Sequence, residues 1–167
     1  PSTNKVTGIK SNNEFEESFN FVLPGYNLRP LELSGAIGIE QLKKLDSFVT
    51  NRRSNAKIFT ELFSNNSAFY IQKEIGESSW FGFSLIINPN SRLNRNVILT
   101  DLKNNGIETR PIVGGNFTKN KTIKFFNFEI FKTLTNAEIV DNYGFFVGNH
   151  HYDLSKELEL LYNLLNV

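Results

Sequence analysis

Hydrophobic residues occupy every second position in a short stretch near the start of the chain. Phe19, Phe21 and Leu23 form this series, which ends at Pro24. A period of two is typical of a strand. Residues 25–29 then have the composition of a turn, and Pro30 suits the first position of a helix, where its missing N–H has no bond to lose. The pattern predicts a strand and a turn that lead into a helix.

From Leu31 the apolar spacing changes to the helical period. The pattern continues to residue 63, and the sequence leaves open whether Asp46-Ser47 divides it into two helices. Gly35 and Gly38 each cost up to about 1 kcal/mol relative to Ala inside a helix, so we expect another element to pack closely there. The following residues are predicted to share one helical face: Ile37, Gln41, Leu42, Leu45, Phe48 and Val49.

The second half of the chain alternates strands with helices. We predict strands at 80–87 and 107–113, with a helix at 95–105 between them that ends at Gly106 in the left-handed conformation. Residues 119–131 are aromatic and fit neither period.

The last part of the chain has two further helices around a short strand. Thr135 and Glu138 have the spacing of a capping box, and Gly144 is predicted to end the helix that it opens. A buried strand at 145–148 follows, and Asp153 is predicted to cap a last helix with Leu154, Leu158, Leu161 and Leu165 on one face. This order predicts an α/β or α+β layer with a small sheet.

Composition excludes several classes of protein. The 167 residues suit one domain, and 40% hydrophobic residues with 16 Phe suffice for a core. With 18 basic and 17 acidic residues the net charge is +1, which gives no reason to expect a nucleic-acid partner. No apolar run approaches the roughly 20 residues of a membrane-spanning helix, and the first residues lack the charged-then-apolar pattern of a leader, so we expect neither a membrane span nor a secretory signal.

The absence of cysteine and methionine carries further expectations. Without Cys there is no disulfide, thiolate nucleophile or Cys-type zinc site. His150 and His151 are adjacent, a spacing that rarely serves one metal ion, so no metal site is expected. The chain starts at Pro1 and contains no Met, which suggests a fragment or a processed chain.

Four polar clusters interrupt the apolar and turn segments, and three of them have a structural alternative. Residues 25–29 place an Asn and an Arg before a helix N-terminus, which suits a phosphate or an ordinary surface turn. Glu108 and Arg110 suit a ligand site or a cross-strand ion pair. Residues 114–117 combine a flexible backbone with one amide. Residues 148–151 follow a buried strand, and α/β folds often bind ligands at such strand ends. The alternative is that the His at this place has a structural role.

Five segments together resemble a known family. Residues 15–45, with the motif Tyr26-Asn27-x-Arg29, are similar to the sugar aminotransferase and dehydratase family of fold-type I pyridoxal phosphate enzymes. Residues 52–56, 76–83, 106–117 and 144–150 narrow the resemblance to the branch of nucleotide-sugar 3-dehydratases that makes 3,6-dideoxysugars for bacterial O-antigens. The resemblance runs from about Asn4 to the end.

The resemblance implies a fold and an activity. It implies that residues 31–167 are the small C-terminal domain of such an enzyme, an α/β (α+β) fold with a short, mostly antiparallel sheet and packed helices. Residues 1–30 would form a preceding segment whose hairpin crosses to a neighbouring subunit. The full enzyme would be a cytoplasmic homodimer that uses pyridoxal phosphate, a GDP-sugar and glutamate, without nucleic acid or membrane. Family members are about twice as long, and the catalytic base and the main cofactor cradle would lie in their N-terminal part, so no residue of this chain is expected to be the base.

The family's site residues map onto eight positions. The resemblance implies that Asn27 and Arg29 bind the cofactor phosphate or a nearby anion. It assigns substrate contacts to Phe19, Tyr26, Glu108, Arg110, Asn116 and His150.

Two other functions stay open from the sequence. The chain could belong to a nucleotide-sugar aminotransferase, which differs in using Lys instead of His as the active-site residue. It could also be a non-catalytic domain that binds a nucleotide-sugar or mediates association.

Overall fold

The computed structural model describes residues 13, 15, 23–26 and 31–166 of the chain. The predicted strand near Phe19 lies outside these residues. From residue 31 onward the described part is continuous and begins with two helices, α2 (Glu32–Leu42) and α3 (Leu45–Phe63), which are separated by a break at Lys43 and Lys44. The chain therefore does form two helices here, but the break precedes Asp46-Ser47.

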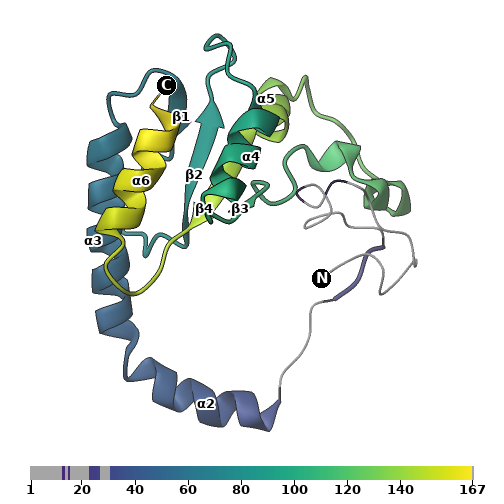
Figure 1. Cartoon of the computed structure of the whole chain (residues 1–167). Helices are drawn as coiled ribbons and strands as arrows, with labels where there is room; N and C mark the ends of the chain where they lie inside the picture. Colours follow the sequence, from purple (N-terminus) through teal and green to yellow (C-terminus); the bar gives the residue numbers. More distant parts are fainter. Residues whose placement is uncertain (1–12, 14, 16–22, 27–30, 167) are drawn as a thin grey trace.

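A four-stranded antiparallel sheet forms the centre of the molecule. Its strands are β1 (Phe69–Ile71), β2 (Gly82–Ile87), β3 (Thr109–Arg110) and β4 (Gly144–Gly148), in the spatial order β1-β2-β4-β3. The remaining helices are α4 (Arg95–Asn104), α5 (Thr135–Tyr143) and α6 (Ser155–Leu165), with the 3₁₀ turns η2 (Phe117–Lys119) and η3 (Lys121–Phe125) between β3 and α5. Figure 1 shows α3 and α6 side by side next to the sheet.

The core lies between the sheet and the pair α3 and α6. Alternate residues of β2 are buried, and Phe83 stacks on Phe59 of α3 with ring centroids 4.5 Å apart. Phe63 makes an edge contact with Tyr162 of α6 at 5.3 Å. The buried residues of α6 confirm the predicted leucine face: Leu158, Leu161 and Leu165.

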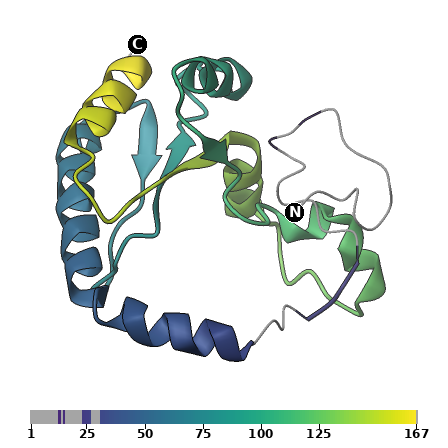
Figure 2. The ribbon, with the colours of Figure 1, turned by 60° about the horizontal axis from the view of Figure 1, so that its bottom comes forward.

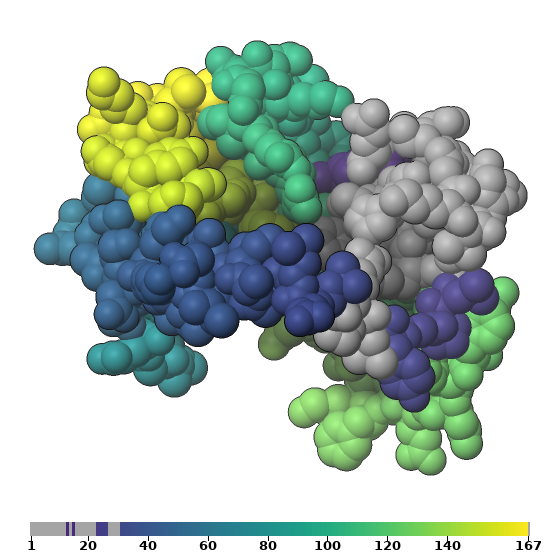
Figure 3. All heavy atoms as spheres, turned by 90° about the horizontal axis from the view of Figure 1, so that it is seen from below, coloured from purple at the N-terminus to yellow at the C-terminus, as the bar shows by residue number. Residues whose placement is uncertain are grey.

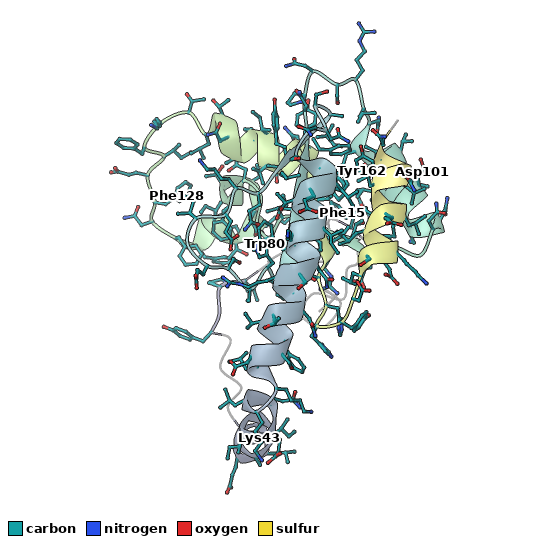
Figure 4. All side chains as sticks on the ribbon, turned by 90° about the vertical axis from the view of Figure 1, so that its left-hand side faces the viewer. Phe15, Lys43, Trp80, Asp101, Phe128 and Tyr162 are labelled. Carbon is teal, nitrogen blue, oxygen red and sulfur yellow. The ribbon has the colours of Figure 1, made fainter. Side chains whose placement is uncertain are left out.

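Helix α2 stands apart from this core. Figures 2 and 4 show it at the far end of α3 from the sheet, with Lys43 remote from Trp80 and Tyr162. None of its residues is buried. A Cβ atom added at Gly35 or Gly38 would meet nothing within 4 Å, so no described element packs closely on these glycines, contrary to the expectation from sequence.

Other local predictions are confirmed or corrected. Gly106 ends α4 with φ +77° as predicted. The capping box is wrong: Leu134 is the N-cap of α5, no side chain caps it, and Glu138 bonds residues outside the helix. The predicted strand at 107–113 shortens to β3 because Pro111 has no N–H for the ladder. The N-cap of α6 is Leu154, not the predicted Asp153; Asp153 precedes it and accepts from the N–H of Ser155, the first helical residue, at 3.0 Å.

Candidate functional site

The predicted cluster at 148–151 is fixed to α3 by two buried amides. Asn55 donates to the side-chain oxygen of Asn149 (3.1 Å) and to the carbonyl oxygens of His150 (3.1 Å) and Tyr152 (2.7 Å). Its own oxygen accepts from the N–H of Leu154 at 3.1 Å. Both Asn55 and Asn149 are more than nine-tenths buried. Because buried amides are costly without partners, these bonds hold the segment after β4 in one conformation.

The same junction includes the start of β2. Asn149 donates to the carbonyl oxygens of Arg52 (3.0 Å) and Trp80 (2.9 Å). Arg52 in turn donates to the carbonyl oxygen of Phe81 at 3.1 Å, and its guanidinium lies 5.9 Å from the centre of that exposed ring. Helix α3, the start of β2 and the end of β4 are thereby joined at one corner of the sheet.

His150 is exposed on this rigid support. Its ring lies 4.4 Å from the ring of His151 and 4.2 Å from that of Tyr152, between ring centroids. His151 packs on Phe48 of α3 at 4.2 Å. The junction therefore presents a row of aromatic rings to solvent, a surface that suits the flat face of a ring-shaped ligand.

Glu108 and Arg110 form an ion pair at the edge strand β3. Two nitrogens of the Arg110 guanidinium donate to one carboxylate oxygen of Glu108, at 3.0 and 2.7 Å. Arg110 pairs with Phe146 in the β3–β4 register. Both side chains are more than half exposed, so the pair adds little to stability and leaves a carboxylate and a guanidinium available to a ligand.

Asn116 belongs to a hydrogen-bond network that connects residues 113–119 to α5. Its side chain donates to Glu138 at 2.8 Å, and its backbone N–H donates to Asp141 at 3.2 Å. Lys119 bridges the two carboxylates, with a bond to Glu138 and one of 3.0 Å to Asp141. Because Asn116 is only 4% exposed, it orders this loop rather than presenting its amide to solvent.

The network shifts the protonation of its charged members. The hydrogen bond to Glu138 raises the pKa of Lys119, and the bond to Asp141 adds to the effect. The bond from Lys119 lowers the pKa of Glu138, helped by the bond from Asn116. Both charged forms are favoured, so the network is intact around neutral pH.

Tyr26 lies at a pocket of about 470 Å³ beside this loop. Its side chain is 95% exposed, and the hydroxyl of Thr122 is the one buried side-chain group of the described residues that lacks a hydrogen-bond partner. No cationic side chain lines the pocket among the described residues. Its lining is mostly apolar: Leu23, Pro24, Gly25, Tyr26, Phe117, Thr122 and Phe126.

The structure therefore places the predicted residues in three groups. Tyr26 and Asn116 lie near one another, since Phe117 lines the pocket of Tyr26. Glu108 and Arg110 contact each other, and His150 lies at another corner of the sheet. Phe19, Asn27 and Arg29 lie outside the described residues. No sequence signal pointed to the supporting residues Lys119 and Asp141, because their partners are distant along the chain. Arg52, Asn55 and Asn149 lie in segments singled out from the sequence (52–56 and 148–151), but without the supporting role that the structure shows.

Comparison with known proteins decides the family. The model of the DegT/DnrJ/EryC1/StrS aminotransferase family matches residues 3–140, most of the chain. The chain belongs to this family.

Among the described residues, no helix is long and apolar enough to cross a membrane, and no group of acidic or His side chains is arranged to hold a metal ion.

Two curated relatives carry the same name, GDP-4-keto-6-deoxy-D-mannose 3-dehydratase. The protein of Yersinia pseudotuberculosis is 57% identical over 99% of this chain, and that of Escherichia coli O55:H7 is 52% identical over 99%. A solved structure of the Escherichia coli enzyme with bound hydrated PLP superposes with a TM-score of 0.79 at 52% identity, over 99% of this chain and 43% of that one. The chain spans 42% and 43% of the length of the two curated relatives.

Proposed function

We propose that this chain is the C-terminal part of a pyridoxal phosphate-dependent nucleotide-sugar 3-dehydratase. The full enzyme would remove the C3 hydroxyl of GDP-4-keto-6-deoxymannose in dideoxysugar and O-antigen biosynthesis. One observation carries this proposal: identity of 57% and 52% to two dehydratases extends over 99% of the chain. The segments with the most specific resemblance, 78–83 and 110–117, are also those that form the start of β2 and the loop after β3.

The described residues fit only part of a cofactor site. The described lining of the pocket beside Tyr26 has aromatic walls and no cationic side chain, which does not suit a phosphate. The Nζ atom of Lys119 is bound to two carboxylates. We therefore place the base and the main cofactor cradle in the part of the enzyme that this chain does not cover. Asn27 and Arg29 would contribute bonds to the cofactor phosphate of the neighbouring subunit.

The chain's own residues would then bind and orient the substrate. Bound pyridoxal phosphate would supply the electron sink for the loss of the C3 hydroxyl. Glu108 and Arg110 would contact the nucleotide-sugar or the carboxylate of glutamate, since their paired charges are exposed. His150 would contact the substrate from the junction that Asn55 and Asn149 hold rigid. Asn116 would hold the loop that faces the substrate.

Further members of the proposed site lie near the start of the chain. Tyr26 would contact the substrate, and Phe19 would close over it from the segment 1–30, which crosses to the neighbour in a homodimer. Structures of the related dehydratase contain GDP-perosamine in one case and glutamate trapped on PLP in another. These bound molecules support a GDP-sugar and glutamate as the two ligands of the full enzyme, which we place in the cytoplasm.

A nucleotide-sugar aminotransferase is the second candidate, because the family contains both activities and the deciding residue lies outside this chain. Incubation of the complete protein with pyridoxal phosphate, glutamate and GDP-4-keto-6-deoxymannose separates the two. Mass spectrometry and NMR should show a sugar that has lost the C3 hydroxyl. A product with an amino group at C4 and an intact C3 hydroxyl would establish the aminotransferase instead. Absence of both products with intact substrate binding would favour a non-catalytic domain.

A further inference from the structure

The pocket beside Tyr26 contains a hydroxyl group without a partner. Thr122 lines this pocket and is only 3% exposed, and its Oγ1 atom makes no hydrogen bond. The backbone N–H of the same residue is satisfied, since it donates to the side-chain oxygen of Asn120 at 3.0 Å. A buried hydroxyl that makes no bond costs stability, so its position at a pocket wall favours a partner that arrives with a ligand.

The walls of the pocket are aromatic and come from two segments. Phe117 of η2 and Phe126, which follows η3, are 44% and 47% exposed, so both rings keep a free surface. Residues 23–26 form the other wall, and Figures 2 and 3 show them (purple) beside the green segment that holds η2 and η3. The volume of about 470 Å³ lies within the roughly 300–1,000 Å³ of small-molecule sites.

The chemistry of this lining restricts the ligand. No cationic side chain lines the pocket among the described residues, so a phosphate or a carboxylate has no counter-charge there. A purely apolar group would suit the rings but would leave the hydroxyl of Thr122 unpaired. A flat, uncharged ring with polar atoms on its edge meets both demands, because its face stacks on Phe117 or Phe126 while its edge bonds the hydroxyl. These are the properties of a nucleobase.

We propose that this pocket holds the base of the nucleotide-sugar, with the hydroxyl of Thr122 bonded to the edge of the base. The inference rests on the proposed function for the class of ligand, and it adds where the base lies. Tyr26, at the pocket, directly precedes the turn at 27–29, and Phe117 directly follows Asn116. The pocket is therefore continuous with both segments that the proposed function places at the cofactor and the substrate. A base that is covalently linked to the sugar must bind within such reach of the reaction site.

Thr122→Val separates a ligand-binding hydroxyl from a structural one. Valine replaces the unpaired hydroxyl by a methyl group, so the ligand-free complete protein should melt at the same or a higher temperature. In calorimetry, the Kd for GDP should rise about three- to tenfold, and the Kd for pyridoxal phosphate should not change. Thr100→Val is the control and should change neither Kd, because the exposed Thr100 hydroxyl bonds the carbonyl of Asn96 on α4. A lower melting temperature, an unchanged Kd for GDP, or an equal effect on pyridoxal phosphate would overturn the proposal.

The aromatic wall gives a second test. Phe126→Ala removes a ring that would stack on the base, so the Kd for GDP should rise at least about fivefold. Phe131→Ala is the matched control, because Phe131 is 92% exposed and is not among the residues that line the pocket. Equal effects of the two changes would overturn the proposal.

Both tests measure binding of GDP and not turnover. A complete protein that proves to be an aminotransferase therefore leaves this inference standing if its GDP binding responds to both substitutions. A dehydratase whose affinity for GDP is independent of Thr122 and Phe126 would refute the inference and leave the proposed function intact.

Discussion

Asn55 and Asn149 hydrogen-bond to each other through their side-chain amides at 3.1 Å, although 94 residues separate them. Asn55 lies on α3, and Asn149 lies directly after β4. Both are almost fully buried, and each bonds backbone groups of the other's segment. The corner of the sheet that presents His150 is therefore set by an amide pair in the interior.

Loss of this amide pair should destabilise the fold. Asn55→Ala would remove the bonds that it donates to the side-chain oxygen of Asn149 and to the carbonyl of Tyr152, at about 1–3 kcal/mol per buried group left without a partner. Asn51→Ala is the control, because the exposed Asn51 makes one bond, to the carbonyl of His151, and should change stability by no more than about 0.5 kcal/mol. Urea unfolding measures both. Equal stability of the two variants would contradict the importance of the pair.

The Lys119 network should make stability depend on pH at both extremes. The pKa of Glu138 is lowered from 4.5, so its contribution is present above pH 4.5 and is lost as the pH falls through the folded-state value. The pKa of Lys119 is raised from 10.5, so its contribution is present below pH 10.5 and is lost above it. Thermal unfolding from acid to alkaline pH should show a plateau between these limits. The Lys119→Met variant should have a lower melting temperature than wild type on the plateau, and the two melting temperatures should converge at acid pH. Parallel curves over the whole range would refute this assignment.

Gly115 should tolerate no side chain, because its φ is +51° and a Cβ would lie 2.3 Å from a carboxylate oxygen of Asp141. Gly106→Ala is the matched control, since Gly106 has φ +77° with nothing within 4 Å. Backbone strain alone should cost each variant about 1–2 kcal/mol. Gly115→Ala should cost more, since it displaces the Asp141 carboxylate from Lys119. The excess should shrink in an Asp141→Ala background. An excess that persists there would mean that another contact causes it.

Asn27 tests the crossing of the first segment to a neighbouring subunit. In the complete enzyme, Asn27→Ala should weaken cofactor retention, because the loss of a hydrogen bond to a charged phosphate costs about 1.5–3 kcal/mol. Mixing this variant with subunits that lack the catalytic base should restore part of the activity, since one site of each hybrid dimer would hold both groups. Turnover of the mixture measures this rescue. Full activity of Asn27→Ala alone would end the phosphate assignment.

The fold could be predicted where the pattern is local. The leucine period of α6 and the glycine at the end of α4 depend on neighbours in sequence, and both were identified. Strand β1 is three residues long and owes its structure to pairing with β2, for which no local pattern exists. The capping box failed for a related reason. The carboxylate of Glu138 finds Asn116 and Lys119, which are distant in sequence, instead of its own helix start.

In the candidate site, too, contacts between sequence neighbours could be predicted and contacts between distant residues could not. Glu108 and Arg110 are two positions apart, and the sequence offered a cross-strand ion pair as one alternative. The ion pair that forms joins these two residues to each other within one segment and does not cross strands. Asn116 and His150 were identified by their places next to a glycine loop and a strand end. Their supports were not, because Asp141 and Asn55 act over 25 and 95 positions of the chain. A spacing rule covers one helix turn or one hairpin, and these contacts exist only after the sheet has formed.

Cofactor binding tests most directly whether this chain supplies only the substrate-facing part of a dehydratase. The 167-residue chain should be titrated with pyridoxal phosphate and followed by absorbance, and its turnover of GDP-4-keto-6-deoxymannose should be measured with glutamate present. We expect no bound-cofactor absorbance and no turnover, because the pocket beside Tyr26 has no cationic side chain among the described residues and the base would lie elsewhere. A yellow, active preparation of this chain alone would contradict the account.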